Sequence, residues 1–265
     1  MSLSWMFLIL LHTFSGILSR HVFVSFPQKW TDAQELCRAN YTDLSPVTSQ
    51  KDARRLHRAY PWDFERPRSW LGLYRSPPNS SVWRWSGGGM AGVYQNWAFH
   101  EPNDWSGEGV AAETYSNGKW NDIKESHKKP FYCIHLLVVN ETAAWEEALE
   151  HCRQNKGHLL SMPSDTRHLL ALRDLQKTNT TQSVWIGLRY LSRRWLWVNG
   201  DPVGFQGWSL AGGNPDNATG ATNDPPHHLQ SPRCPVLNGW GCGAMTREGV
   251  WEARNCQEKL SFICD

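Results

Sequence analysis

The stretch WTDAQELC at residues 30–37 returns as WEEALEHC at residues 145–152, so one tryptophan-to-cysteine segment occurs twice in the chain. The two copies are 115 positions apart (145 minus 30). The same offset relates WLGL at residues 70–73 to WIGL at residues 185–188. Self-similarity at a fixed offset is the sign of a repeated structural unit. The chain is therefore built from two copies of one fold.

The offset changes further along each copy. QNW at residues 95–97 matches QGW at residues 206–208, an offset of 111 (206 minus 95). PFYC at residues 130–133 matches SFIC at residues 261–264, an offset of 131 (261 minus 130). A constant offset that later drifts indicates a stable framework interrupted by a long loop of variable length.

The repeat divides the chain into residues 20–134 and 135–265, with almost no linker between the copies. A length of 265 residues suits two modest domains. The net charge is only +2, which argues against nucleic acid or an anionic membrane as a partner. Sixteen tryptophans indicate small cores built on a few large aromatic anchors.

The N-terminus carries an apolar run at residues 5–18, too short for a membrane span, and Ser19 follows it. We predict a signal peptide over residues 1–19, with an uncleaved anchor as the alternative. No later segment is apolar enough to cross a bilayer. Seven cysteines and five glycosylation sequons agree with a secreted, extracellular protein. The sequons begin at Asn40, Asn79, Asn140, Asn179 and Asn217.

Local patterns predict the same elements in both copies. Opening strands are expected at residues 21–24 and 134–139. Apolar residues at helical spacing predict first helices with Thr31 and Thr142 as N-cap candidates. The helices are expected at residues 31–38, 49–59, 143–153 and 164–176. The tryptophan-rich remainder of each copy, with its many glycines and prolines, predicts short strands and long loops.

Four features recur in order in both copies: the helix cysteine, the W-L/I-G-L box, a later tryptophan triplet and a closing F-x-C. In the first copy that triplet is WND at residues 120–122. Together they resemble the C-type lectin-like domain family, and the resemblance covers everything after residue 19. It is greatest to secreted or receptor proteins with tandem domains. The resemblance implies an α+β fold, each domain having two helices, small antiparallel sheets and a long loop region.

The resemblance also implies a disulfide pattern, with an outer bridge in each copy and an inner bridge in the long-loop region. The implied pairs are Cys37–Cys133, Cys152–Cys264 and Cys242–Cys256. The first copy departs from the pattern, because Val110 or Ala111 and Glu125 stand where its inner cysteines would be. Cys234 is left over, which indicates an unpaired or intermolecular thiol.

The first copy contains the residues of the family's calcium site. EPN at residues 101–103, with a proline that the resemblance implies is cis, precedes Glu108 and the WND triplet. Calcium prefers several carboxylate and amide oxygens, which these segments supply. Glu108 lies one residue closer to Glu101 than the family pattern has it. The predicted ligands of a single Ca²⁺ are Glu101, Asn103, Glu108, Asn121 and Asp122.

The resemblance gives four of these residues a second task. Vicinal hydroxyls of a sugar bind the ion, Glu101 and Glu108 accept their protons, and the amides of Asn103 and Asn121 donate to their oxygens. The EPN order implies a preference for mannose, fucose or N-acetylglucosamine, with glycans or glycoproteins as partners. The alternative is a relic site on a fold used for calcium-independent contacts with proteins.

The second copy has NPD at residues 214–216 and WEA at residues 251–253, so the Asn-Asp ligand pair is missing. We predict no calcium there and a scaffold or protein-binding role. Neighbouring His227 and His228 lie among prolines and indicate an exposed loop pair, as His100 indicates a solvent-facing loop residue. The sequence has no serine-hydrolase, zinc-protease or phosphate-loop motif, which argues against an enzyme.

Overall fold

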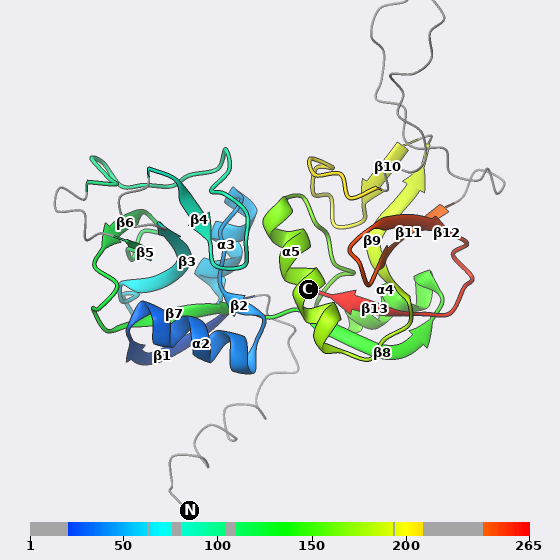
Figure 1. Cartoon of the computed structure of the whole chain (residues 1–265), viewed down its shortest axis with the longest axis horizontal. Helices are drawn as coiled ribbons and strands as arrows, with labels where there is room; N and C mark the ends of the chain where they lie inside the picture. The colour runs from blue at the N-terminus through cyan, green and yellow to red at the C-terminus, as the bar shows by residue number, and fades with distance from the viewer. Residues whose placement is uncertain (1–20, 63, 76–80, 104–109, 193, 209–240) are drawn as a thin grey trace, which may run out of the picture.

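The computed structural model describes residues 21–62, 64–75, 81–103, 110–192, 194–208 and 241–265 (Figure 1). The expected signal peptide and Cys234 lie outside these residues. The described chain forms two domains side by side, each with its own sheet and two helices. Within the described residues no helix combines the length and apolar composition needed to cross a bilayer.

The first domain is a seven-stranded sheet with the order β1-β7-β3-β5-β6, with β2 paired to β7 and β4 paired to β3. Strands β1 and β7 are antiparallel, so the two ends of the domain lie next to each other. The elements are β1 (His21–Gln28), α2 (Trp30–Asn40), β2 (Asp43–Leu44), α3 (Gln50–Arg58), β3 (Ser69–Arg75), β4 (Trp83–Trp85), β5 (Ala111–Thr114), β6 (Trp120–Ile123) and β7 (Lys129–Ile134).

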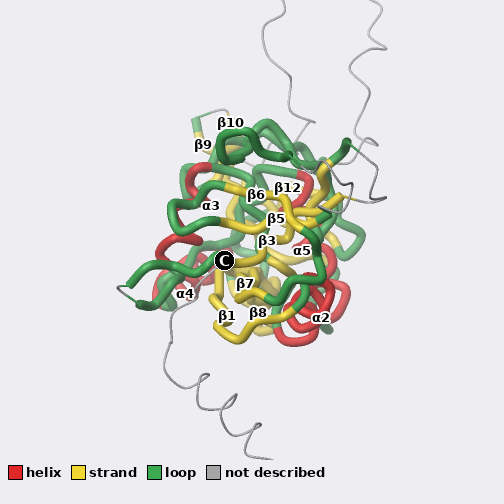
Figure 2. Tube along the Cα trace, turned by 90° about the vertical axis from the view of Figure 1, so that its left-hand side faces the viewer, coloured by secondary structure: helices red, strands yellow, loops and turns green. Residues whose placement is uncertain are grey.

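The second domain repeats this plan with the strand order β12-β11-β9-β13-β8, and β10 pairs with β9. Its elements are β8 (Leu137–Ala143), α4 (Trp145–Gln154), α5 (Asp165–Lys177), β9 (Ser183–Leu191), β10 (Arg194–Trp197), β11 (Gly241–Thr246), β12 (Trp251–Arg254) and β13 (Leu260–Cys264). The architecture is therefore α+β twice over, as predicted, but each sheet is mixed rather than antiparallel, because β3 pairs with β7 and β9 with β13 in parallel. Long loop segments gather on the side of the strands away from α2 (Figures 1 and 2).

The second helix of each domain begins as the sequence predicts. The hydroxyl of Ser49 accepts a hydrogen bond from the Asp52 amide (3.1 Å), and that of Ser164 accepts one from the Arg167 amide (3.4 Å). A serine at the N-cap satisfies an amide that the helix itself leaves without a partner. Each capping hydrogen bond joins residues only three positions apart in the sequence.

The first helix of each domain begins differently from the prediction. It starts at Trp30 or Trp145, and the N-cap residues Lys29 and Ala144 make no side-chain cap bond. Thr31 and Thr142 as N-caps were therefore wrong. Each tryptophan is buried, and its indole donates to a carbonyl of the W-L/I-G-L strand, at 2.8 Å in the first domain and 2.9 Å in the second. Tertiary packing of the tryptophan sets the helix start.

The opening strand expected at residues 134–139 is present but begins only at Leu137, because the expected range divides between the two sheets. Ile134 ends β7 of the first domain, and Leu137 begins β8 of the second. A continuous apolar run does not show that its two halves pair with different partners. The chain passes from one sheet to the other within these few residues.

All three expected disulfides are present. They join α2 to β7, α4 to β13, and β11 to the segment after β12, as Cys37–Cys133, Cys152–Cys264 and Cys242–Cys256. In the first domain Ala111 takes the place of Cys242, since Ala111 faces Ile123 as Cys242 faces Arg254. The amide of the helix tryptophan donates to the Glu125 carbonyl (3.0 Å) in the first domain and to the Cys256 carbonyl (2.9 Å) in the second. Backbone hydrogen bonds thus keep this geometry where the inner disulfide is lost.

Tryptophan anchors both cores. Each domain buries five of them among its described residues: Trp30, Trp70, Trp83, Trp85 and Trp120 in the first, and Trp145, Trp185, Trp195, Trp197 and Trp251 in the second. Large aromatic side chains contribute much buried area per residue, which suits domains with little regular secondary structure. The structural explanation for the tryptophan content is confirmed for these residues.

The glycine of the W-L/I-G-L box lies against backbone. A Cβ on Gly72 would lie 2.7 Å from the Leu44 carbonyl oxygen, which belongs to the neighbouring strand. We expect Gly72→Ala to lower the free energy of unfolding by about 2–3 kcal/mol, because backbone cannot move aside as a side chain can. Gly92→Ala is the control, since nothing lies within 4 Å of its Cβ position. Equal melting temperatures for the two variants would contradict this.

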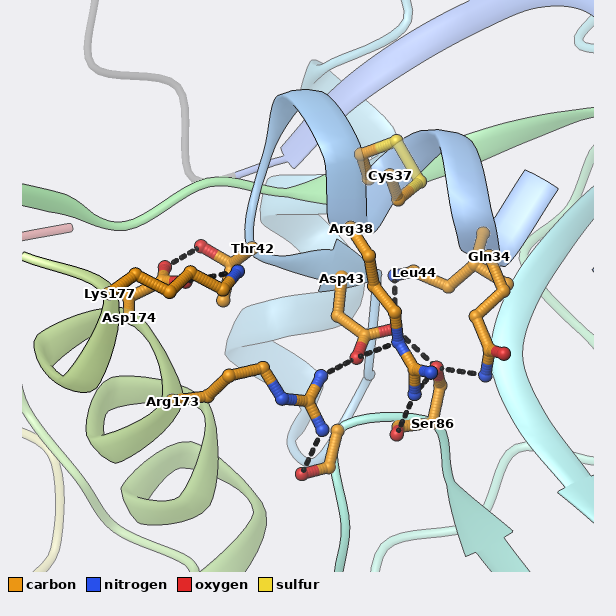
Figure 3. Close-up of polar contacts among 12 residues, drawn as sticks. Gln34, Cys37, Arg38, Thr42, Asp43, Leu44, Ser86, Arg173, Asp174 and Lys177 are labelled. Carbon is orange, nitrogen blue, oxygen red and sulfur yellow. Dashed lines mark hydrogen bonds and ion pairs between the residues drawn. A yellow bond between two sulfur atoms is a disulfide. The ribbon is translucent and has the colours of Figure 1, made fainter. Parts of the chain in front are cut away.

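The two domains contact each other through α5 and the β2 region (Figures 1 and 3). Arg173 of α5 binds the carboxylate of Asp43, and Asp174 accepts a hydrogen bond from Thr42. At a second point Lys51 donates to Asp201 (2.6 Å). The contact is thus a set of charged and polar pairs between segments more than a hundred residues apart.

Apolar packing accompanies these polar pairs. The turn after β4 lies so close to α5 that a Cβ on Gly87 would meet the Leu170 side chain at 2.4 Å. Leu170 is fully buried in the core of the second domain. We call this contact, made by Thr42, Asp43, Lys51 and Gly87 with α5 and Asp201, the interdomain joint.

Candidate functional site

The candidate site is built on the β5–β6 hairpin of the first domain. In its register Ala112 faces Asp122 and Glu113 faces Asn121. The loop before the EPN segment runs along β6, where the Ala98 amide donates to the Trp120 carbonyl (2.8 Å). Backbone pairing therefore carries residues 101–103 to the hairpin although about twenty residues separate them from WND.

The EPN segment closes onto Asp122. The Asn103 amide donates to Asp122 Oδ1 (2.9 Å), and Asn103 Nδ2 donates to Glu101 Oε1 (3.0 Å). The Glu101–Pro102 peptide is cis, as the resemblance implied. The structure thus brings Glu101, Asn103 and Asp122 together, whereas Glu108 lies outside the described residues.

The two carboxylates of this cluster repel each other. Burial first, and then a hydrogen bond and the charge of Asp122, raise the pKa of Glu101 to about 7. Glu101 Oε2 is buried and accepts no hydrogen bond from the described residues. Asp122 itself is only 6% exposed. A divalent cation would neutralise both carboxylates, so the donor set fits calcium.

Glu113 is a part of the site that sequence reasoning missed. It is fully buried, and its Oε1 accepts a hydrogen bond from Asn121 Nδ2 (2.9 Å) while its Oε2 lies 2.7 Å from Lys129 Nζ. This bond fixes which way the Asn121 amide points. Asn121 Oδ1 then stays available to an ion, and the second hydrogen on Asn121 Nδ2 stays available to an oxygen of a bound ligand. The signal was a glutamate inside an otherwise apolar strand, AAET at residues 111–114.

The equivalent positions of the second domain are arranged differently. Trp251 is buried like Trp120, but Glu252 replaces Asn121 and Ala253 replaces Asp122. The Glu252 carboxylate accepts a hydrogen bond from Ser183 Oγ (2.9 Å) and pairs with Arg254 (3.2 Å). A charged pair and a methyl group take the place of the carboxylate–amide ligands. Residues 214–216 of this domain lie outside the described part of the chain.

Within the described residues, the remaining candidates give no second site. Glu146 lies near the sulfur atoms of Cys242 and Cys256, but these are joined in a disulfide and are not free to bind a metal. His100 is exposed, with a φ of 65°, immediately before Glu101. His227 and His228 fall outside the described residues.

Comparison with known proteins gives the family directly. The family model for the lectin C-type domain matches the chain twice, at residues 26–135 and 141–265. Human C-type mannose receptor 2 is 23% identical over 286 aligned residues, which cover 93% of this chain and 18% of the receptor. C-type lectin lectoxin-Lio1 of Erythrolamprus poecilogyrus is 32% identical over 131 residues, 49% of this chain and 64% of the lectoxin. The chain thus spans less than two thirds of either relative.

Among solved structures, human lithostathine has 22% identity and a TM-score of 0.40, covering 43% of this chain and 81% of that chain. The carbohydrate-recognition domain of the mouse scavenger receptor C-type lectin has 26% identity and a TM-score of 0.38, covering 43% of this chain and 84% of that chain. With both halves matched by the family model and both built on the same strand and helix plan, the chain belongs to the C-type lectin domain family, with two such domains in tandem.

Proposed function

We propose that the first domain binds one Ca²⁺ ion and, through it, a glycan ending in mannose, fucose or N-acetylglucosamine. The observation that carries the proposal is the closeness of two carboxylates, half-buried Glu101 and buried Asp122, whose mutual charge helps to raise the pKa of Glu101. Asn103, Asn121 and Glu108 complete the proposed ligand set. Bound calcium supplies the positive centre to which two vicinal sugar hydroxyls bind.

The protein residues determine which sugar fits. Glu101 and Glu108 accept protons from the hydroxyls, while Asn103 and Asn121 donate N–H hydrogens to the sugar oxygens. Glu113 supports this by holding Asn121 in one orientation through its 2.9 Å hydrogen bond. A sugar must match this alternation of acceptors and donors, which gives the site its selectivity.

The acceptor–donor order is open to a direct test. Glu101→Gln combined with Asn103→Asp exchanges one acceptor for a donor and one donor for an acceptor. We expect the double variant to retain calcium and to shift its preference from mannose toward galactose by about tenfold. Competition by the two free sugars against an immobilised glycan measures the shift. An unchanged preference would show that these residues do not contact the sugar.

We further propose that the second domain binds no calcium and acts as a scaffold or a protein-binding domain. The Glu252–Arg254 pair and Ala253 at its ligand positions support this. We infer a secreted, non-enzymatic glycoprotein. The sequon residues Asn40, Asn140 and Asn179 are exposed, whereas Asn79 and Asn217 lie outside the described part.

Titration of calcium into the full chain tests the central proposal, followed by a glycan array with and without chelator. Heat of binding, a rise in melting temperature and chelator-sensitive glycan binding are expected. If millimolar calcium gives neither heat nor a melting shift, the chain is instead a calcium-independent module for protein contacts.

The raised pKa of Glu101 predicts a pH dependence. In the calcium-free protein this carboxyl is protonated below about pH 7, against an ordinary pKa of 4.5. A raised carboxyl pKa stabilises the calcium-free fold below pH 4.5, and this contribution is lost as pH rises through 7. Calcium must displace the proton, so calcium affinity should fall as pH falls from 7 to 5. Calcium titrations in buffers of different ionisation enthalpy should show that protons are released at pH 6. No proton release would contradict the raised pKa of Glu101.

A further inference from the structure

Two arginines from the segment before β3, Arg66 and Arg68, contact the turn of the β5–β6 hairpin that carries the candidate calcium site. The guanidinium carbon of Arg68 is 4.6 Å from the centre of the Tyr115 ring. Arg66 Nη1 donates to the carbonyl of the next residue, Ser116 (3.3 Å). The two guanidiniums therefore contact consecutive residues, Tyr115 and Ser116, of one hairpin. Stacking on Tyr115 holds Arg68 in place, although its side chain is 62% exposed.

Only one carboxylate, that of Glu113, lies within 4 Å of this arginine pair among the described residues. Glu113 lies 3.5 Å from Arg68, but Lys129 is closer to the same carboxylate, at 2.7 Å, and is largely buried. Among the described residues, Arg66 has no carboxylate within 4 Å and Arg68 has none besides Glu113. Lys129 thus balances Glu113, and a guanidinium remains exposed for an additional anion.

This basic pair adjoins the proposed sugar-binding residues. Glu113 Oε1 is the shared partner of Arg68 Nη1 and of Asn121 Nδ2. The charges of Glu101, Glu113 and Asp122 all reach Tyr115, whose pKa is raised by burial first and by these charges as well. A small hollow of about 30 Å³ is lined by Arg66, Tyr115 and Ser116 among others.

We infer that Arg68, with Arg66 and Tyr115, forms an anionic subsite for a sulfate or carboxylate group on the same glycan that the calcium ion holds. The inference rests on the proposed calcium-dependent glycan binding and names its substrate class, an acidic glycan. An arginine fork suits the paired oxygens of either anion, and a neutral mannose terminus makes no use of it. Because Glu113 contacts both Arg68 and Asn121, we expect the acidic group on the calcium-bound sugar or on the sugar unit next to it.

The test uses the full chain with calcium and three matched immobilised oligosaccharides. One ends in neutral mannose, one carries a sulfate ester on the terminal or penultimate residue, and one carries a uronic acid there. We expect at least one acidic glycan to bind about five- to tenfold tighter than the neutral one at low salt. This ratio should fall toward one as sodium chloride is raised, because an exposed ion pair is screened.

Variants assign the effect to the subsite. Arg68→Gln should bring the acidic-to-neutral affinity ratio to about one, and Arg68→Lys should keep part of it, since charge remains without the fork. Arg194→Gln removes the same charge from an exposed residue at the start of β10 in the second domain and should leave the ratio unchanged. The ratio is informative even if a variant weakens binding overall.

Three results would overturn the inference. They are equal affinity for all three glycans, a ratio that survives in Arg68→Gln, and a ratio that persists under chelator. The last would place anion binding away from the calcium-held glycan. Loss of all glycan binding with calcium present would instead refute the proposed function itself, and the neutral glycan reports that failure separately.

Discussion

Asp122→Asn is expected to weaken calcium binding by the full chain at least about 100-fold. The substitution preserves the size of the side chain and removes one of the two carboxylates that face the proposed ion. Asp122 is also nearly buried, and its Oδ1 accepts the Asn103 amide at 2.9 Å. Isothermal titration of calcium gives the affinity, and chelator-sensitive glycan binding should disappear in parallel.

The same variant has a predicted effect on stability. Saturating calcium stabilises the wild-type fold by RT ln(1 + [L]/Kd), about 2.7 kcal/mol at a hundred times the Kd. The calcium-dependent rise in melting temperature should therefore be absent from Asp122→Asn. Calcium-free Asp122→Asn should be no less stable than the calcium-free wild type, because repulsion with Glu101 is relieved.

Glu252→Gln is the matched control, because this residue occupies the Asn121 position of the second domain. It removes a carboxylate from the equivalent β11–β12 hairpin and leaves the proposed calcium ligands of the first domain unchanged. We expect calcium affinity and glycan binding to equal those of the wild type. A loss in this control equal to that in Asp122→Asn would show that calcium binds elsewhere.

Motifs with a fixed sequence spacing could be predicted, because their chemistry is local or is repeated in the chain. The disulfide pairs were implied by the family resemblance, and the second helices begin next to Ser49 and Ser164, where the local pattern predicts them. The EPN and WND segments were likewise assigned to one site, and the structure does bring Glu101, Asn103 and Asp122 together.

Features that depend on long-range packing could not be predicted in the same way. The helix starts at Trp30 and Trp145 because each indole binds a strand carbonyl 41 residues away. Glu113 matters because its neighbours are Asn121 and Lys129, which only the strand register reveals. The alignment of the copies treats each domain separately, so it contains no information about which residues join them.

The interdomain joint carries the second large expected effect. The Asp43 carboxylate is fully buried, and it binds Arg38 (3.1 Å), Ser86 and Arg173 of the other domain. Asp43→Ala removes the carboxylate that both guanidiniums bind and leaves them only carbonyl and hydroxyl acceptors. We expect a loss of about 3 kcal/mol in the free energy of unfolding, at the low end for a broken buried pair because both arginines are partly exposed.

Arg173→Ala separates the contribution between domains from that within the first domain. It leaves the Arg38–Asp43 pair intact and removes only the contact from α5. If the joint couples the domains, calorimetry should show one unfolding transition for the wild type and two resolved transitions for Arg173→Ala. Lys177→Ala is the control on the same helix, since its pair with Asp174 is within the second domain and its side chain is 47% exposed. Two transitions already in the wild type would show that the joint does not couple the folding of the two domains, and one transition in every variant would show that the Arg173 contact is not what couples them.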